Sequence, residues 1–255
     1  ICKELSQDPI LWTIHIVDHS NALYVPWISD LPVIVTCHDV GAIQGARGEL
    51  DDCRASFFGK ILQKRILSGL MQATQCVAVS EYTKSNLCRL RALTSENNNF
   101  ACSVVLNPIP TDLIDVNKEK ELDEKEKYFQ EIVSKKYILN VGSNLRRKNR
   151  EVVIKVFSEW AKDKEARLVF VGVHLTPRLW QLAQQLGVSE KIVDLGKVSS
   201  SALRFLYQNA FALLFPSRFE GFGWPIIEGQ ALGVPVIAGE NSAMVEVAGE
   251  GAFLC

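Results

Sequence analysis

The stretch FALLFPSRFEGFGWPIIEGQALGVPVIAG, residues 211–239, holds two apolar runs separated by a glycine-rich loop and a helical pattern. The runs FALLF and VPVIA are short and continuous, which is typical of strands buried on both faces. Pro225 suits the first turn of a helix and Gly233 suits the position after its end, so we expect a helix over 224–232. Strand, helix and strand in this order predict an α/β fold.

The same alternation extends through both halves of the chain. The strand-like runs are TIHIVD, PVIVTCH, CVAVSE and SVVLN in the first half, and YILNVG, RLVFVG and KIVDLG in the second. Helix-like stretches such as RASFFGKILQKRILSGLMQA and NREVVIKVFSEWAKDK stand between them. The pattern predicts doubly wound parallel sheets that are covered by helices on both faces.

A charge-rich stretch, DVNKEKELDEKEKYFQEIVSKK over 115–136, separates the two halves. We interpret it as a solvated helix or linker rather than a functional acidic tail. The sequence therefore predicts a Rossmann-like domain over 1–118, a charged linker or helix over 119–135, and a second Rossmann-like domain over 136–255. Ligands of such sheets bind beyond the carboxyl ends of the strands, so the expected site is a cleft between the two domains.

The composition argues against a nucleic-acid-binding protein, a membrane-spanning protein and a protein held together by zinc or disulfides. A formal net charge of −1 over 255 residues gives no general attraction to nucleic acid, which is not expected as a partner. The longest apolar runs are of strand length and too short to span a membrane. Seven cysteines without a CxxC pair indicate reduced thiols rather than a zinc or disulfide framework. We expect a cytoplasmic protein and leave peripheral attachment to a membrane open.

The loop and helix of 217–233 can bind a phosphorylated, hydroxyl-rich ligand. Gly221 and Gly223 allow positive φ and a close approach of the backbone to a ligand. The start of the expected helix offers free N–H groups to a phosphate. Glu220 and Glu228 can accept hydrogen bonds from sugar or ribose hydroxyls. A plain glycine turn with ordinary acids at a helix start explains the same residues, and local features do not separate the two interpretations.

A basic cluster lies in YILNVGSNLRRKNREVVIKVF, residues 137–157. Arg146, Arg147, Lys148 and Arg150 are denser than a fold requires. Cations on a loop beside a ligand would neutralise a diphosphate leaving group. The alternative is an exposed basic helix start, which the helix dipole disfavours.

Three of the four histidines lie in TIHIVDHSNALYVPWISDLPVIVTCHD, residues 13–39. We expect His15, in the middle of a strand, to be a hydrogen-bonded core residue. Asp18 and His19 follow the end of that strand, and His38 follows the next strand. Because ligands of α/β sheets bind at these ends, we expect Asp18, His19 and His38 to line a site.

These three segments resemble the retaining, GT-B-fold glycosyltransferases of family four. Glu220 and Glu228 match its E-x7-E segment, Gly142 to Asn149 match its VG-x4-RKN motif, and HIVDHS resembles its histidine-bearing acceptor-side loop. The resemblance covers nearly the whole chain. The strand and glycine-rich loop that open a family member have no counterpart before TIHIVD, and the last elements are absent, so we expect a fragment.

The resemblance implies a retaining hexosyl or other glycosyltransferase of polysaccharide biosynthesis. A sugar would move from a UDP-, GDP- or dTDP-linked donor to a hydroxyl of a glycan or lipid-linked acceptor. Glu220 would contact the donor sugar and Glu228 the ribose, while Arg147 and Lys148 would bind the diphosphate. Since cations and a helix dipole can stabilise the leaving group, neither a metal nor another cofactor is expected.

The resemblance also assigns the remaining site residues. His19 would lie near the reacting sugar, which makes the expected catalytic set His19, Arg147, Lys148 and Glu220, with Asp18 and His38 beside it on the acceptor side. Further donor contacts are expected from Gly142, Ser143, Lys197, Val198, Ser217, Gly221, Phe222 and Gly223.

Ser143 stands where many members carry an arginine, and we expect Arg147 or Arg146 to substitute for it. His174 is expected near the nucleotide base. Two alternatives stay open: a GT-B-fold nucleotide-sugar epimerase, and a non-catalytic subunit that binds nucleotide sugars.

Overall fold

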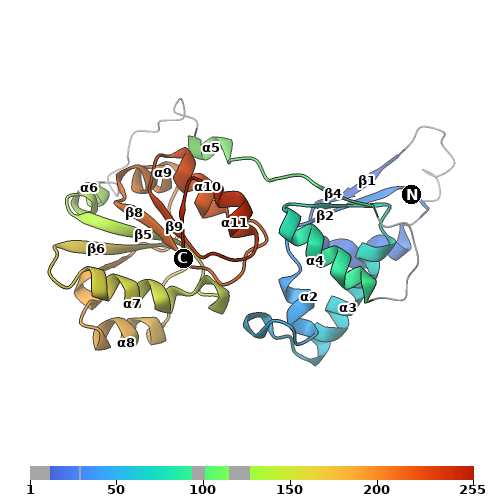
Figure 1. Cartoon of the computed structure of the whole chain (residues 1–255), viewed down its shortest axis with the longest axis horizontal. Coiled ribbons are helices and arrows are strands. Elements are labelled where there is room, and N and C mark those ends of the chain that lie inside the picture. The colour runs from blue at the N-terminus through green and yellow to red at the C-terminus, as the bar shows by residue number, and fades with distance from the viewer. Residues whose placement is uncertain (1–11, 29, 94–100, 115–126) are drawn as a thin grey trace. The chain divides into compact units, whose positions relative to one another are not determined.

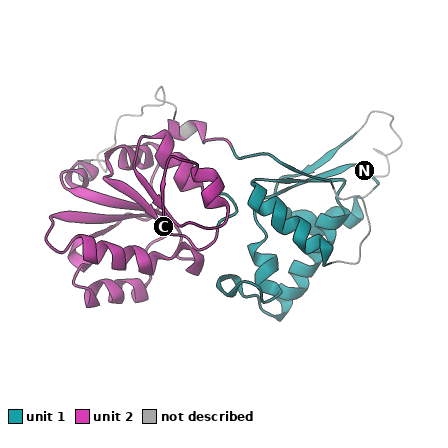
Figure 2. Cartoon of the chain, viewed as in Figure 1, with its two compact units in different colours: residues 1–107, 220–222 teal, residues 108–219, 223–255 magenta. Residues whose placement is uncertain are grey.

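The computed structural model describes residues 12–28, 30–93, 101–114 and 127–255. The chain divides into two compact units, one formed by residues 1–107 with 220–222 and the other by 108–219 with 223–255 (Figure 2). Each unit is a parallel sheet with helices packed against it. The predicted α/β class is confirmed.

The first unit has a four-stranded parallel sheet in the order β1-β2-β3-β4. Its strands are β1 (Ile14–Ile16), β2 (Val33–Cys37), β3 (Gln75–Ala78) and β4 (Ala101–Val104). Its helical segments are η1 (His19–Trp27), α2 (Gly41–Ala46), η2 (Asp51–Cys53), α3 (Phe57–Gln72) and α4 (Glu81–Ala92).

Side-chain caps and one close contact shape this unit. Ser56 caps α3 by accepting a hydrogen bond from the Gly59 N–H, and Ser80 caps α4 by accepting one from the Thr83 N–H. Gly69 lets α3 approach η1, because a Cβ there would lie 1.9 Å from the Ala22 carbonyl oxygen.

The expectation that His15 is a core residue is wrong. Within the described sheet β1 is an edge strand paired only with β2, and the His15 side chain is exposed. Its Nε2 lies 2.8 Å from Thr36 Oγ1. A mid-strand position therefore did not imply burial in this short edge strand.

The second unit has a six-stranded parallel sheet in the order β10-β9-β8-β5-β6-β7, of which β5, β6, β8 and β9 are labelled in Figure 1. The strands are β5 (Lys136–Gly142), β6 (Ala166–Gly172), β7 (Ile192–Asp194), β8 (Ala212–Phe215), β9 (Val236–Ala238) and β10 (Phe253–Leu254). The helical segments are α5 (Thr111–Ile114), α6 (Lys127–Val133), η5 (Arg146–Lys148), α7 (Arg150–Trp160), α8 (Pro177–Gln185), η6 (Ser189–Lys191), α9 (Ser200–Asn209), α10 (Trp224–Ala231) and α11 (Ala243–Ala248).

Two apolar cores cover the two faces of this sheet. Ile138 and Phe170 pack against α7 and α8 on one face, while Leu139 and Phe215 pack against α9, α10 and α11 on the other. Adjacent residues of β5 thus enter different cores, which explains why the strand reads as a continuous apolar run. The chain reverses direction across the sheet between β5 and β8, and ligands of doubly wound sheets bind at that switch point.

The expected linker or helix over 119–135 falls only partly within the described residues. Residues 119–126 lie outside them, and α6 occupies Lys127–Val133. Within the described part of the chain, no helix has both the length and the apolar character that crossing a membrane requires.

Candidate functional site

The loop between β5 and α7 carries the expected diphosphate-binding cations. The strand ends at Gly142 (φ +154°), η5 holds Arg146, Arg147 and Lys148, and α7 begins just after Asn149. A Cβ at Gly142 would lie 3.7 Å from Lys148 Cδ, so the lysine stem runs beside the end of β5. Lys148 Nζ lies 5.0 Å from the centroid of the Phe215 ring at the end of β8. Lys148 is therefore at the switch point of the sheet.

This loop is bonded to the segment that follows β8. The Arg147 carbonyl oxygen accepts a hydrogen bond from the Arg218 N–H (2.7 Å), and Arg147 Nη1 donates to the Phe219 carbonyl oxygen (3.0 Å). Asn149 Nδ2 donates to the carbonyl oxygen of Pro216 (3.0 Å). The cations of η5 and residues 216–219, which are far apart in the sequence, therefore lie side by side.

The Ser143 side chain makes a local hydrogen bond in the turn that follows β5. Its Oγ accepts a long hydrogen bond (3.5 Å) from the Leu145 N–H. Arg146 is exposed, whereas Arg147 and Lys148 are half-buried.

Helix α10 confirms the expected helix after the glycine loop. It runs over Trp224–Ala231, follows Gly223 (φ +110°) and has Leu232 as its C-cap, just before Gly233 (φ +76°). Glu228, on this helix, accepts a 2.7 Å hydrogen bond from the Tyr207 hydroxyl on α9. Burial, and then the negative charge of Glu228, raise the pKa of Tyr207 well above its usual value, so the hydroxyl keeps its proton.

Residue Ser217 is buried, and its Oγ has no hydrogen-bond partner among the described residues. The Ser217 carbonyl oxygen accepts a 3.3 Å hydrogen bond from Asn241 Nδ2. A buried hydroxyl that lacks a protein partner is a reasonable place for a ligand contact.

Lys197 and Val198 follow β7, with Lys197 exposed and Val198 packed against the core. The His174 ring lies over Gly196, where a Cβ would come within 2.4 Å of its Nε2. His174 Nδ1 is 3.2 Å from Asp194 Oδ1. His174, Lys197 and Val198 are thereby gathered at the carboxyl ends of β6 and β7.

Glu220, Gly221 and Phe222 are all buried and belong to the first unit, whereas Gly223 and Glu228 belong to the second. Within the first unit the Gly221 carbonyl oxygen accepts hydrogen bonds from Ser80 Oγ (2.8 Å) and Thr83 Oγ1 (3.2 Å). A Cβ at Gly221 would lie 1.9 Å from the His38 carbonyl oxygen, so glycine is required by a close approach.

Asp18, His19 and His38 come together in the first unit, at the carboxyl ends of β1 and β2. Asp18 caps η1 by accepting a 2.8 Å hydrogen bond from the Ser20 N–H, and this bond lowers the pKa of Asp18. His19 Nδ1 lies 3.8 Å from Asp18 Oδ1, and His38 Nε2 is 2.9 Å from the Val17 carbonyl oxygen.

Burial lowers the pKa of His19, against the opposing influence of the nearby carboxylates Asp39 and Asp18. The ring is consequently neutral at pH 7.

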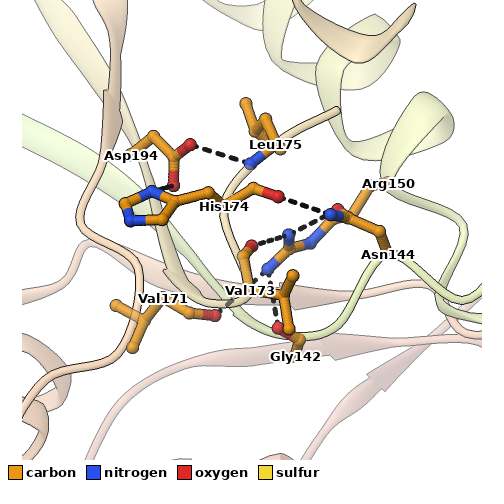
Figure 3. Close-up of polar contacts among 8 residues, drawn as sticks. All are labelled: Gly142, Asn144, Arg150, Val171, Val173, His174, Leu175 and Asp194. Carbon is orange, nitrogen blue, oxygen red and sulfur yellow. Dashed lines mark hydrogen bonds and ion pairs between the residues drawn. The ribbon is translucent and has the colours of Figure 1, made fainter. Parts of the chain in front are cut away.

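The expectation that Arg150 belongs to a ligand-facing cation cluster is wrong. Its side chain is 3 % exposed and is enclosed by the ends of β5 and β6 (Figure 3).

No role was predicted for Asn144 or Tyr207, because their hydrogen-bond partners lie on segments that meet only in the folded structure. Among the described residues, no group of three His, Cys, Asp or Glu side chains could hold a metal ion.

The sequence of the chain is similar to that of a known protein family and of individual relatives. The sequence profile of the family described as "Glycosyl transferases group 1" matches residues 123–255. The chain is 26% identical over 229 residues to the O-antigen chain mannosyltransferase RfbU of Salmonella typhimurium, with 88% of this chain and 60% of that protein covered. It is 30% identical over 166 residues to an uncharacterized glycosyltransferase of Methanocaldococcus jannaschii, covering 64% and 41%. The chain thus spans 60% or less of the length of these relatives.

Solved structures share the fold at low identity. Sucrose-phosphate synthase from Thermosynechococcus elongatus superposes with a TM-score of 0.73 at 18% identity, covering 95% of this chain and 60% of that one. Anabaena HepE in complex with UDP and glucose gives a TM-score of 0.73 at 15% identity, covering 99% and 65%. These neighbours are GT-B glycosyltransferases, and the predicted GT-B fold is confirmed.

Proposed function

The chain belongs to the glycosyl transferases group 1 family, and from this premise we propose that it moves a sugar from a nucleotide diphosphate sugar to a hydroxyl of an acceptor, with retention of the anomeric configuration. We call the loop of residues 143–149, which carries Arg146, Arg147 and Lys148, the cation loop. The observation that carries the proposal is the set of hydrogen bonds between this loop and the segment after β8. Arg147 is hydrogen-bonded to both Arg218 and Phe219, and Lys148 lies over Phe215. Cations at the switch point of a parallel sheet suit a diphosphate.

In this proposal the second unit binds the donor. Lys148 and Arg147 stabilise the negative charge that develops on the leaving diphosphate. The free N–H groups at the start of α10 assist them. Glu228, which is oriented by the Tyr207 hydroxyl, accepts hydrogen bonds from the ribose. Gly142, Ser143 and Ser217 line the phosphate-binding part, and Lys197 and Val198 flank the base.

Glu220 positions the donor sugar, and Asp18, His19 and His38 serve the acceptor side. A neutral His19 can exchange hydrogen bonds with hydroxyl groups without competing for the phosphate. We also propose that the protein's own cations do this work without a divalent metal.

Relatives suggest the class of donor and acceptor. Anabaena HepE has been solved with UDP and glucose, and the Salmonella relative is named an O-antigen chain mannosyltransferase. We therefore propose a hexose donor and a glycan or lipid-linked glycan acceptor.

The test is incubation of the chain with UDP-, GDP- and dTDP-hexoses and lipid-linked glycan acceptors, with and without EDTA. Released nucleotide and an EDTA-insensitive glycosylated product of unchanged anomeric configuration would support the proposal. An isomerised donor would indicate the epimerase instead, and donor binding without any turnover would indicate a binding subunit. Loss of transfer with EDTA would overturn the metal-free mechanism alone.

A further inference from the structure

Arg150, the first residue of α7, uses every N–H group of its guanidinium inside the protein, and Figure 3 shows the bonds from its two Nη atoms. A guanidinium has five N–H donors, and five hydrogen bonds are formed. The acceptors are Asn140 Oδ1 (3.3 Å, from Nε), Asn144 Oδ1 and the Val173 carbonyl oxygen (2.8 and 2.6 Å, from Nη1), and the carbonyl oxygens of Gly142 and Val171 (2.8 and 3.1 Å, from Nη2). The residue therefore ties the end of β5 to the end of β6.

All five acceptors are neutral, yet Arg150 remains a cation. Burial lowers its pKa to about 10, and the negative charge of Asp194 opposes that change. At neutral pH the group is protonated, and a buried cation costs desolvation free energy. An apolar residue would satisfy the core-facing pattern of α7 without that cost. The five hydrogen bonds are what an apolar residue could not supply.

Asn144 extends these contacts across the next loop. Its Nδ2 donates to the His174 carbonyl oxygen, while its Oδ1 accepts from Arg150. Asp194, at the end of β7, accepts a 2.8 Å hydrogen bond from the Leu175 N–H. We call Asn144, Arg150 and Asp194 the brace, because together they join the carboxyl ends of β5, β6 and β7 (Figure 3).

The brace holds the two ends of the cation loop, where it leaves β5 and where it enters α7. Gly142 and Asn144 lie where the loop leaves β5, and Arg150 lies where it enters α7, two residues after Lys148. Asn149, the residue between them, has a left-handed backbone (φ +57°) and makes no side-chain cap for α7. The course of the loop at this end is therefore set by the anchored Arg150 together with the hydrogen bond from Asn149 to the Pro216 carbonyl oxygen.

We propose that Arg150 is a positioning residue: through Asn144 and the ends of β5 and β6 it holds Arg147 and Lys148 where they bind the diphosphate of the donor. This inference rests on the proposed function. It predicts that the brace governs affinity for the second phosphate of a nucleotide, and leaves affinity for the base, ribose and first phosphate unchanged.

The test is calorimetric titration of the whole chain with the pairs UMP and UDP, GMP and GDP, and dTMP and dTDP. We expect the wild type to prefer the diphosphate of at least one pair. Arg150→Lys keeps the charge but has only three N–H donors, and Asn144→Ala removes one arm of the brace. Each should lower the preference for diphosphate over monophosphate about tenfold, equivalent to about 1.4 kcal/mol, with monophosphate affinity unchanged.

Arg178→Gln is the matched control. Arg178 lines the same cavity of about 620 Å³ as Arg150, but it is 81 % exposed and pairs with Glu151 at 2.8 Å. This variant should keep the wild-type preference. If Arg150→Lys does not fold, Asn144→Ala decides the matter, since Asn144 is only partly buried.

An unchanged preference in a folded brace variant would overturn the inference and leave the proposed function intact. An equal loss of monophosphate and diphosphate affinity would also overturn it, because the brace would then be supporting the fold of the whole site. A wild type that binds no diphosphate would overturn the proposed function and the inference together.

Discussion

Arg150 in the second unit and His19 in the first are two basic side chains whose pKa values burial lowers, but only the arginine is charged at neutral pH. In the second unit Arg150 has five hydrogen-bond acceptors and stays protonated, with a pKa of about 10. In the first unit His19 Nδ1 has no hydrogen-bond partner among the described residues, and burial lowers its pKa. Burial lowers the pKa of both groups, but an arginine that starts from 12.5 stays protonated at pH 7, whereas a histidine that starts from 6.5 does not.

This difference matches the two proposed roles. The unit that retains buried positive charge also carries Arg147 and Lys148, and it suits a diphosphate. The unit with the neutral histidine offers hydrogen-bonding groups without added positive charge, which suits the hydroxyl groups of a glycan. Four predictions test or sharpen the contrast, in order of falling effect.

The largest effect is expected from removing the cation at the switch point. Lys148→Ala should lower the rate of nucleotide release about a hundredfold, because one preorganised group that stabilises developing charge is lost. The melting temperature should change little, since the side chain is only half-buried. Lys155→Ala, which removes an exposed lysine from α7, is the control and should keep the wild-type rate. Equal rates for Lys148→Ala and wild type would refute the phosphate role.

A smaller loss is expected for the ribose contact. Glu228→Ala should weaken binding of nucleoside monophosphate and diphosphate alike, by about tenfold, because a charge-assisted hydrogen bond is removed. Tyr207→Phe keeps the carboxylate and removes only the 2.7 Å hydrogen bond that orients it, so its effect should be weaker. If Glu228→Ala affected only the diphosphate, the glutamate would belong to the phosphate site instead.

The neutral state of His19 predicts a dependence of stability on pH. Below the ordinary histidine pKa of 6.5 the unfolded chain binds a proton at this residue, whereas folded His19, with its lowered pKa, does not until the pH is lower. The stability of the wild type should therefore fall as the pH is lowered from 7 to 5. His19→Gln should lose less stability over this range in urea titrations. Parallel losses in both proteins would show that folded His19 titrates normally.

The smallest effect concerns an exposed ion pair. Arg178→Gln breaks the pair with Glu151 on the surface of the second unit. Exposed pairs contribute little, so the free energy of unfolding should change by less than about 0.5 kcal/mol. A larger change in chemical denaturation would show that this pair contributes more to stability than exposed ion pairs normally do.

Much of the fold could be read from the sequence, because strand burial and helix ends have local causes. The continuous apolar runs predicted parallel strands, and Pro225 with Gly233 located α10. Three charged or polar side chains at strand ends, Asp18, His19 and His38, could likewise be expected to meet, since parallel strands end at one edge of a sheet.

The errors and omissions have a different cause. Arg150 looked like one more exposed cation in a basic run, and only the packed ends of β5 and β6 reveal its acceptors. His15 looked buried because the position of β1 at the sheet edge is a property of the topology. Tyr207 meets Glu228 only when α9 and α10 pack on the same core. Contacts between distant segments leave no local pattern to read.

The most direct test of the central claim, that the second unit binds a nucleotide diphosphate donor, is one set of calorimetric titrations. Nucleoside monophosphates and diphosphates would be titrated into the wild type, Lys148→Ala and Glu228→Ala. We predict that the wild type binds a diphosphate more tightly than its monophosphate, that Lys148→Ala removes this preference, and that Glu228→Ala weakens both ligands equally. A wild type without the preference, or a Lys148→Ala protein that keeps it, would contradict the account.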